Sequence, residues 1–156
     1  AGVGGGRLRA GRAEAGGGQL GRVGGEFGAT TGRARRCGWF DAVVARHAAR
    51  VNGITGLAVT KLDVLDGLEG IKVCVAYHRN GRRPANPGIL DVCGPVCEEM
   101  PGWSESTADA RQFAELPRAA QDYIRRLEVL TGLPVDILSV GPDREQTIVL
   151  NNPFTA

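Results

Sequence analysis

Long apolar runs are missing from this 156-residue sequence, so it predicts no membrane-spanning helix. It also lacks the charged-then-apolar opening of a secretory signal, and we therefore expect a cytoplasmic protein. An excess of one charge is missing too, since the formal net charge is only +2. That value gives no indication of a nucleic-acid or membrane partner. The length suits one hydrophobic core of ordinary size.

The four cysteines show no metal-binding or redox spacing. No pair has the two intervening residues of a zinc knuckle or a thioredoxin motif. Cys74 alternates within an apolar run and is interpreted as a small core residue. Cys93 and Cys97 could meet as metal ligands or as a disulfide, although reduced thiols are the default without a secretion signal.

Catalytic pairings of histidine or carboxylate are also missing. Neither His47 nor His78 has a serine, cysteine or carboxylate at catalytic spacing. Asp63 and Asp66 are three residues apart in an expected turn, which does not indicate acid–base chemistry. We assign no catalytic residue within this chain.

Lysine is scarce and arginine abundant. Only Lys61 and Lys72 are lysines, so 17 of the 19 basic residues are arginines. Residues 1–50 carry about +6 by count, and the cluster at 33–36 suits a small polyanion. A coding bias toward arginine is an alternative explanation for the other arginines.

The first 25 residues differ in composition from the rest. They include eleven glycines and show no period of 2 or 3.6 residues. Such a segment buries too little apolar surface to offset its ordering entropy. We therefore expect residues 1–25 to be a disordered or non-native segment, and residues 26–156 to form the domain.

Helix and strand patterns alternate along the remainder, which predicts an α/β fold. A helix is expected from Asp41, a plausible cap, to Asn52, with Val43, Val44, His47 and Val51 on one apolar face. A second is expected over 116–130, with Pro117 at its first position and Gly132 after its end. Strands are expected at 57–60, 71–77, 135–140 and 147–150, a loop at 80–87 and irregular chain at 95–103.

Thr60-Lys61-Leu62-Asp63 follows the first expected strand and resembles the guanine-reading motif of GTP-using proteins. Guanine presents an N1–H and a 2-amino group side by side, and one carboxylate can accept both. A lysine stem can lie along the base while its ammonium group reaches a ribose or loop oxygen. The alternative is a solvated turn after a strand.

Two further loops carry groups that bind anions or bases. The threonines, glycines and arginines at 28–35 can hold a carboxylate and bridge a second anion, unless this segment is only a flexible polar linker. Ser139-Val140-Gly141 ends a strand and can line a base pocket, unless it is a plain strand-terminating turn.

The order of these motifs resembles the carboxyl-terminal third of adenylosuccinate synthetase. The resemblance covers residues 26–150 and implies part of a P-loop-NTPase-like fold with an incomplete sheet. It rests on the motifs at 28–33, 37–41, 52–55, 61–66, 101–103, 116–117 and 139–144.

Members of that family are ligases of purine and AMP biosynthesis, which join inosine monophosphate (IMP) to L-aspartate using GTP and Mg²⁺. They work as homodimers. The resemblance implies that Arg33 contacts IMP and aspartate and that Arg35 faces GTP. It assigns aspartate and IMP binding to Ala29, Thr30, Thr31, Gly32, Arg33, Ala34 and Arg35. It assigns GTP binding to Arg35, Lys61, Leu62, Asp63, Ser139, Val140 and Gly141.

The family's Gly- and Lys-rich phosphate loop, catalytic Asp and catalytic His have no counterpart in this sequence. The Mg²⁺ ligands are expected in that same amino-terminal part. We therefore expect a fragment that is inactive by itself. The alternative is a non-catalytic remnant that binds a guanine nucleotide weakly or a partner protein.

Overall fold

The computed structural model describes residues 38–78 and 93–152. The chain divides into two compact units, one of Ala1–Val43 with Lys72–Glu99 and the other of Val44–Ile71 with Met100–Ala156. The Gly-rich segment 1–25 and the loop predicted at 80–87 lie outside the described residues. In the part that is described, no helix is both long and apolar enough to cross a bilayer.

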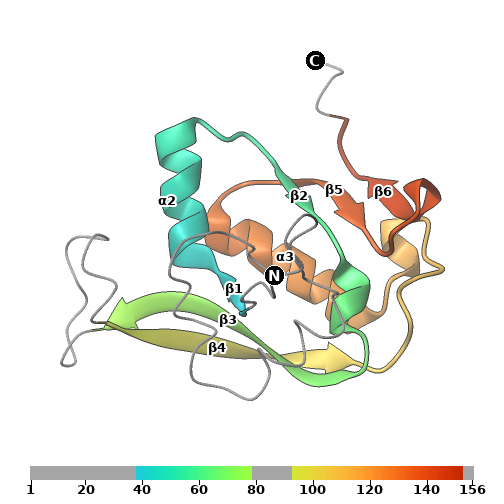
Figure 1. Cartoon of the computed structure of the whole chain (residues 1–156), viewed down its shortest axis with the longest axis horizontal. Helices are drawn as coiled ribbons and strands as arrows, with labels where there is room; N and C mark the ends of the chain where they lie inside the picture. Colours follow the sequence, from blue (N-terminus) through green and yellow to red (C-terminus); the bar gives the residue numbers. More distant parts are fainter. Residues whose placement is uncertain (1–37, 79–92, 153–156) are drawn as a thin grey trace, which may run out of the picture. The chain divides into compact units, whose positions relative to one another are not determined.

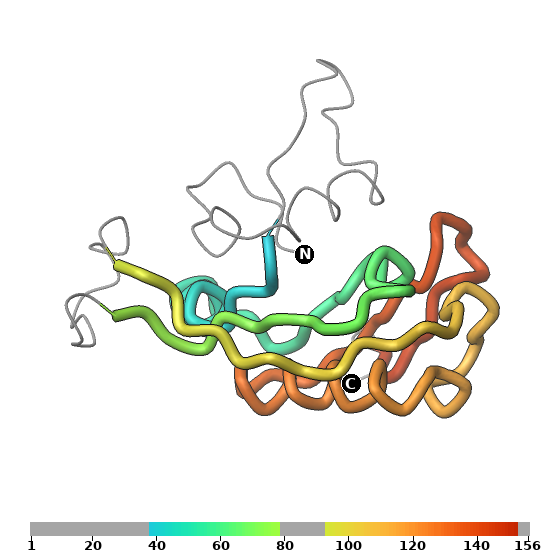
Figure 2. Tube along the Cα trace, turned by 90° about the horizontal axis from the view of Figure 1, so that it is seen from below, coloured from blue at the N-terminus to red at the C-terminus, as the bar shows by residue number. Residues whose placement is uncertain are grey.

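One sheet has the strand order β1-β3-β4, where β1 is Phe40–Asp41, β3 is Leu68–His78 and β4 is Gly94–Trp103. The short strand β1 runs parallel to β3 and places Asp41 beside Cys74. The strands β3 and β4 run in opposite directions, and the tube view traces both along their length (Figures 1 and 2). The predicted strand at 71–77 is therefore confirmed and extends further at both ends.

The irregular chain predicted at 95–103 is wrong, because these residues belong to β4. Pro95 and Pro101 argued against a strand, since proline offers no N–H to a neighbouring strand. The strand β4, however, lies at the end of the order β1-β3-β4. An edge strand has one side without a strand partner and therefore tolerates proline.

In the first unit, a small core forms around Cys74, Tyr77 and Cys93. The hydroxyl of Tyr77 donates a hydrogen bond to Oδ2 of Asp41, and both side chains are buried. The other carboxylate oxygen of Asp41 accepts the backbone N–H of Val43 at 3.0 Å. Asp41 therefore caps the following helix as predicted.

That helix, α2, spans Ala42–Asn52, close to the prediction. Val43, Val44, His47 and Val51 share one face of this helix as predicted, but most of that face is exposed. Val44 and Val51 are 43% and 69% exposed, and His47 is exposed as well. Periodicity identifies which residues share a helix face, but not whether another element covers that face.

The second unit contains a sheet with the order β2-β5-β6, seen in Figure 1. The strands are β2 (Leu57–Val59), β5 (Val135–Ser139) and β6 (Thr147–Val149), each near a predicted strand. The strand β2 runs parallel to β5, with Val59 beside Leu138. The carboxyl ends of these two strands therefore lie at the same edge of the sheet.

The helix α3 spans Arg118–Thr131, and its predicted apolar stripe is confirmed by buried side chains. It begins two residues later than expected, with Pro117 as the capping residue instead of the first helical one. Gly132 ends the helix in the left-handed conformation, with φ of 74°, as its position predicted. Buried stripe residues are Ala120, Tyr123, Ile124 and Leu127.

Candidate functional site

Two predicted site segments, Lys61–Asp63 and Ser139–Gly141, meet at the carboxyl ends of β2 and β5. The backbone N–H of Lys61 donates a hydrogen bond to the hydroxyl of Ser139 at 3.1 Å. The contact follows from the parallel pairing of β2 and β5, which brings both strand ends to one edge. Ligands of open α/β sheets bind at such an edge.

The backbone at Lys61 adopts a conformation that is uncommon for its side chain. Its φ of 60° and ψ of 48° are left-handed, and within the described residues it is the one non-glycine residue with positive φ. A left-handed conformation costs about 1–2 kcal/mol for a residue with a Cβ. Such backbone conformations concentrate at binding and catalytic sites.

After Lys61 the chain forms the 3₁₀ helix η1, Leu62–Leu65, where the sequence predicted only a turn. The side chains of Leu62 and Leu65 are buried, at 1% and 6% exposure, and anchor the helix in the core. The anchoring fixes the direction of Asp63, which lies between them. Leu62, assigned to nucleotide binding by resemblance, has its side chain in this core.

Asp63 has one carboxylate oxygen, Oδ1, that is buried and has no hydrogen-bond partner among the described residues. Leaving a buried acceptor unpaired costs about 1–3 kcal/mol, and more for a charged group. Most buried polar atoms of native proteins are paired with protein or with ordered water, so an unpaired carboxylate oxygen calls for a partner from outside the described residues. The atom is suited to accept a hydrogen bond from a ligand.

The facing segment, Ser139–Gly141, is held from behind by Gln146. Val140 is fully buried, and its N–H donates to the backbone oxygen of Gln146 at 2.9 Å. A Cβ at Gly141 would lie 2.1 Å from Oε1 of Gln146. Only glycine therefore fits at position 141 without displacing Gln146.

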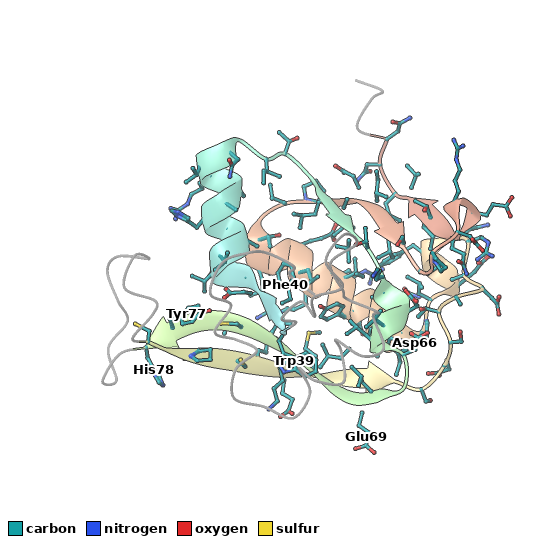
Figure 3. The ribbon with its side chains drawn as sticks, viewed as in Figure 1. Trp39, Phe40, Asp66, Glu69, Tyr77 and His78 are labelled. Carbon is teal, nitrogen blue, oxygen red and sulfur yellow. The ribbon has the colours of Figure 1, made fainter. Side chains whose placement is uncertain are left out.

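Sequence reasoning missed a group of residues that supports η1. Asp66, at the end of η1, accepts the indole N–H of Trp103 at 2.6 Å. It also accepts the backbone N–H of Thr107 at 2.8 Å and the Thr107 hydroxyl at 3.0 Å. Figure 3 labels Asp66 next to this short helix. Asp66 thus has several hydrogen-bond donors, whereas Oδ1 of Asp63 has none in the part of the chain that the structure describes.

The residue after Thr107 supports the other segment. The backbone oxygen of Ala108 accepts a hydrogen bond from Nε2 of Gln146 at 3.1 Å. Gln146 lies in the 3₁₀ helix η4, Arg144–Gln146, and its Oε1 accepts the N–H of Asp143. No local signal in the sequence indicates the contact of Gln146 with Ala108, because it joins residues 38 positions apart.

The other predicted site residues, Ala29–Arg35, lie outside the described residues. Within 38–78 and 93–152, no three His, Cys, Asp or Glu residues are grouped as a metal ion would need. The described part of the candidate site therefore has the chemistry of hydrogen bonding to a base: one unpaired carboxylate oxygen, a serine hydroxyl and a glycine turn.

Comparison with known proteins extends the resemblance to most of the chain. Residues 1–148 match the family model described as adenylosuccinate synthetase, and this match includes the Gly-rich segment. The adenylosuccinate synthetase of Geotalea daltonii is 56% identical over 147 residues, covering 92% of this chain and 34% of that protein. That of Syntrophus aciditrophicus is 58% identical over 145 residues, covering 90% and 34%.

A solved structure agrees with these sequence matches. The fully ligated adenylosuccinate synthetase from Plasmodium falciparum is similar with a TM-score of 0.82 at 35% identity. The similarity covers 92% of this chain and 36% of that one. The chain thus spans about a third of the length of the relatives it matches. The family match over residues 1–148, together with this fold similarity, shows that the chain belongs to the adenylosuccinate synthetase family.

Proposed function

We propose that this chain forms the guanine-binding part of an adenylosuccinate synthetase, the GTP-dependent ligase that joins IMP to L-aspartate in AMP biosynthesis. Family membership supports the reaction. The observation that carries the site is the buried Oδ1 of Asp63 at the carboxyl edge of the sheet, for which residues 38–78 and 93–152 supply no hydrogen-bond donor. A guanine base presents two adjacent hydrogen-bond donors, and a carboxylate can accept both.

In the proposed site, Asp63 accepts the N1–H and 2-amino groups of guanine. The Lys61 stem lies along the base, and Ser139 to Gly141 complete the pocket from the facing strand. The Lys61–Ser139 hydrogen bond of 3.1 Å supports the proposal, because it brings both segments to one place. Adenine is rejected, since its 6-amino group and unprotonated N1 do not match a carboxylate acceptor pair.

We propose the remaining roles on the resemblance alone. Ala29 to Arg35 bind aspartate and IMP, with Arg33 between the two substrates and Arg35 facing GTP. Cationic forks beside a transferring phosphoryl group stabilise the charge that develops there. Mg²⁺ supplies further charge neutralisation in the family reaction, but the described residues contain no cluster that fits a metal ion, and we assign no step to it. Homodimer formation and a cytoplasmic location are likewise proposed by resemblance.

We expect the 156-residue chain by itself to form no adenylosuccinate, because the phosphate loop and the catalytic Asp and His implied by the resemblance are not within it. The second candidate is a module that binds a guanine nucleotide or a partner protein without chemistry. The first candidate and the nucleotide-binding form of the second share the guanine site. Measurable adenylosuccinate formation by the purified chain would exclude the second candidate and contradict our expectation.

The guanine site is tested by calorimetric titration of the chain with GDP and with ADP. We expect GDP to bind more tightly, and Asp63→Asn to remove that preference, because the substitution replaces one accepting oxygen of the carboxylate with a donating NH₂ group. Asp109→Asn, at an exposed position in the same unit, is the matched control and should keep the preference. Equal affinities of the unmodified chain for GDP and ADP would refute the guanine site.

A further inference from the structure

Two consecutive residues in the loop after β4 contact Asp66 and Gln146, the residues that hold the two segments of the candidate site in place. Thr107 donates its backbone N–H and its hydroxyl to the carboxylate of Asp66. Ala108 accepts the side-chain N–H of Gln146 at 3.1 Å. Asp66 follows the η1 helix that carries Asp63, and Gln146 holds the Ser139–Gly141 segment. A single dipeptide thus connects to both pocket segments.

On the first side, the connection from Thr107 to Asp63 is short and buried. Thr107 is fully buried, and Trp103, which donates to the same Asp66 carboxylate, is 4% exposed. The backbone N–H of Asp66 donates to the backbone oxygen of Asp63 at 3.1 Å. A carboxylate that accepts several protein donors is held in one orientation, and η1 is held with it.

On the second side, the connection from Ala108 passes through one glutamine. Gln146 uses its Nε2 for Ala108, its Oε1 for the N–H of Asp143, and its backbone oxygen for the N–H of Val140. The side chain also occupies the space that a Cβ at Gly141 would need. The position of Gln146 therefore determines where the Ser139–Gly141 segment lies.

We propose that Thr107 and Ala108 are positioning residues that set the separation between Asp63 and the Ser139–Gly141 segment, and thereby the selectivity for guanine. This inference rests on the guanine site proposed above. Neither residue touches the base in this arrangement. Selectivity depends on their contacts because a hydrogen-bonding site loses discrimination when its acceptor is displaced by about 1 Å or less.

The selectivity is measured as the ratio of the dissociation constants of inosine diphosphate (IDP) and GDP. These ligands differ only in the 2-amino group, so the ratio reports the hydrogen bond from that group to Asp63. A variant that only loses folding stability binds both ligands more weakly by the same factor, so the ratio of the dissociation constants does not change. A displaced Asp63 lowers the ratio.

The test variant is Thr107→Val, which removes the hydroxyl donated to Asp66 and keeps the side-chain volume. Thr131→Val is the matched control in the same unit, since Thr131 is also buried and its hydroxyl donates to the backbone oxygen of Leu127 at 2.7 Å. Thr107→Ser retains the hydroxyl and is the rescue variant. Gln146→Glu removes the donor to Ala108 at a half-buried position and tests the second connection independently of the first.

We expect Thr107→Val and Gln146→Glu each to lower the IDP-to-GDP ratio by about tenfold, the value of a well-aligned hydrogen bond to a charged group. Thr131→Val and Thr107→Ser should keep the original ratio. An unchanged ratio in Thr107→Val and in Gln146→Glu overturns the positioning role while leaving the guanine site intact. A ratio near one in the unmodified chain refutes the guanine site itself, and the positioning role with it.

Discussion

The backbone N–H of Lys61 donates a hydrogen bond of 3.1 Å to the hydroxyl oxygen of Ser139, 78 positions further along the chain. Lys61 follows β2 and Ser139 ends β5, so the bond joins the ends of two parallel strands. It fixes the left-handed backbone of Lys61 beside the segment expected to face the same base.

The contribution of this bond can be measured with Ser139→Ala. We expect the free energy of unfolding to fall by about 0.5–1 kcal/mol, because the lost bond is partly replaced by water. GDP affinity should fall more than ADP affinity. The control is Ser104→Ala, whose hydroxyl makes only a long 3.4 Å contact with Glu105 on an exposed loop. Urea titration that gives the same result for both variants would contradict the role of Ser139.

Asp63→Asn is expected to stabilise the ligand-free chain while removing guanine preference. The buried Oδ1 has no protein partner among the described residues, so a neutral amide relieves the cost of burying an unpaired charge. We expect a gain of about 1 kcal/mol in the free energy of unfolding, measured in urea without nucleotide. The exposed control Asp109→Asn should change stability little. A destabilised Asp63→Asn would mean that Oδ1 already has a partner in the protein.

The backbone strain at Lys61 is tested by comparing Lys61→Gly with Lys61→Ala. Both substitutions remove the same ammonium group, so their difference isolates the backbone. At φ of 60° glycine carries no steric cost, and we expect Lys61→Gly to be more stable than Lys61→Ala by about 1 kcal/mol. Thermal unfolding of the two variants provides the measurement. Equal stability would show that position 61 is not left-handed in solution.

Alkaline pH should destabilise the first unit through Cys74. Burial, then the Asp41 carboxylate and Cys97, raise the pKa of the Cys74 thiol from 9.0 to about 12. Because the folded state holds this proton more tightly, its contribution is complete below pH 9 and is lost as the pH rises to about 12. Burial also raises the pKa of Tyr77 well above its usual range, which acts in the same direction.

The measurement is the free energy of unfolding in urea at a series of pH values above 8, with Cys74→Ala as the comparison. We expect the unmodified chain to lose stability more steeply over this range than the variant does. Parallel pH profiles would mean that the Cys74 thiol ionises as freely in the folded chain as in the unfolded one.

The sequence was most informative where local rules decide the structure. Asp41 caps α2, Gly132 ends α3, and the apolar stripe of α3 is buried, each as its pattern predicted. It was least informative where contacts with a neighbouring element decide the structure or the burial of a segment. Proline at 95 and 101 argued against a strand, yet both lie in the edge strand β4. The residues on the apolar face of α2 could be predicted from the sequence, but the exposure of that face could not.

The candidate site divides in the same way. Lys61, Asp63 and Ser139 were predicted from the family resemblance together with their chemistry and their place at strand ends, and their proximity follows from parallel pairing of two predicted strands. Thr107 and Gln146 carried no signal, because an ordinary threonine or glutamine in a polar loop indicates nothing about its distant partner. Ala29 to Arg35 stay a prediction, since they lie outside the described residues.

By itself the sequence determined the α/β class, the capping roles of Asp41 and Gly132 and the residue types suited to a guanine base, because propensity, capping and hydrogen-bonding chemistry are local properties. The tertiary structure alone decided that Asp66 is paired while Oδ1 of Asp63 has no partner among the described residues, and that Thr107 and Ala108 contact Asp66 and Gln146, which adjoin the two site segments. Which acceptors stay unpaired depends on the burial and partners that distant parts of the chain supply.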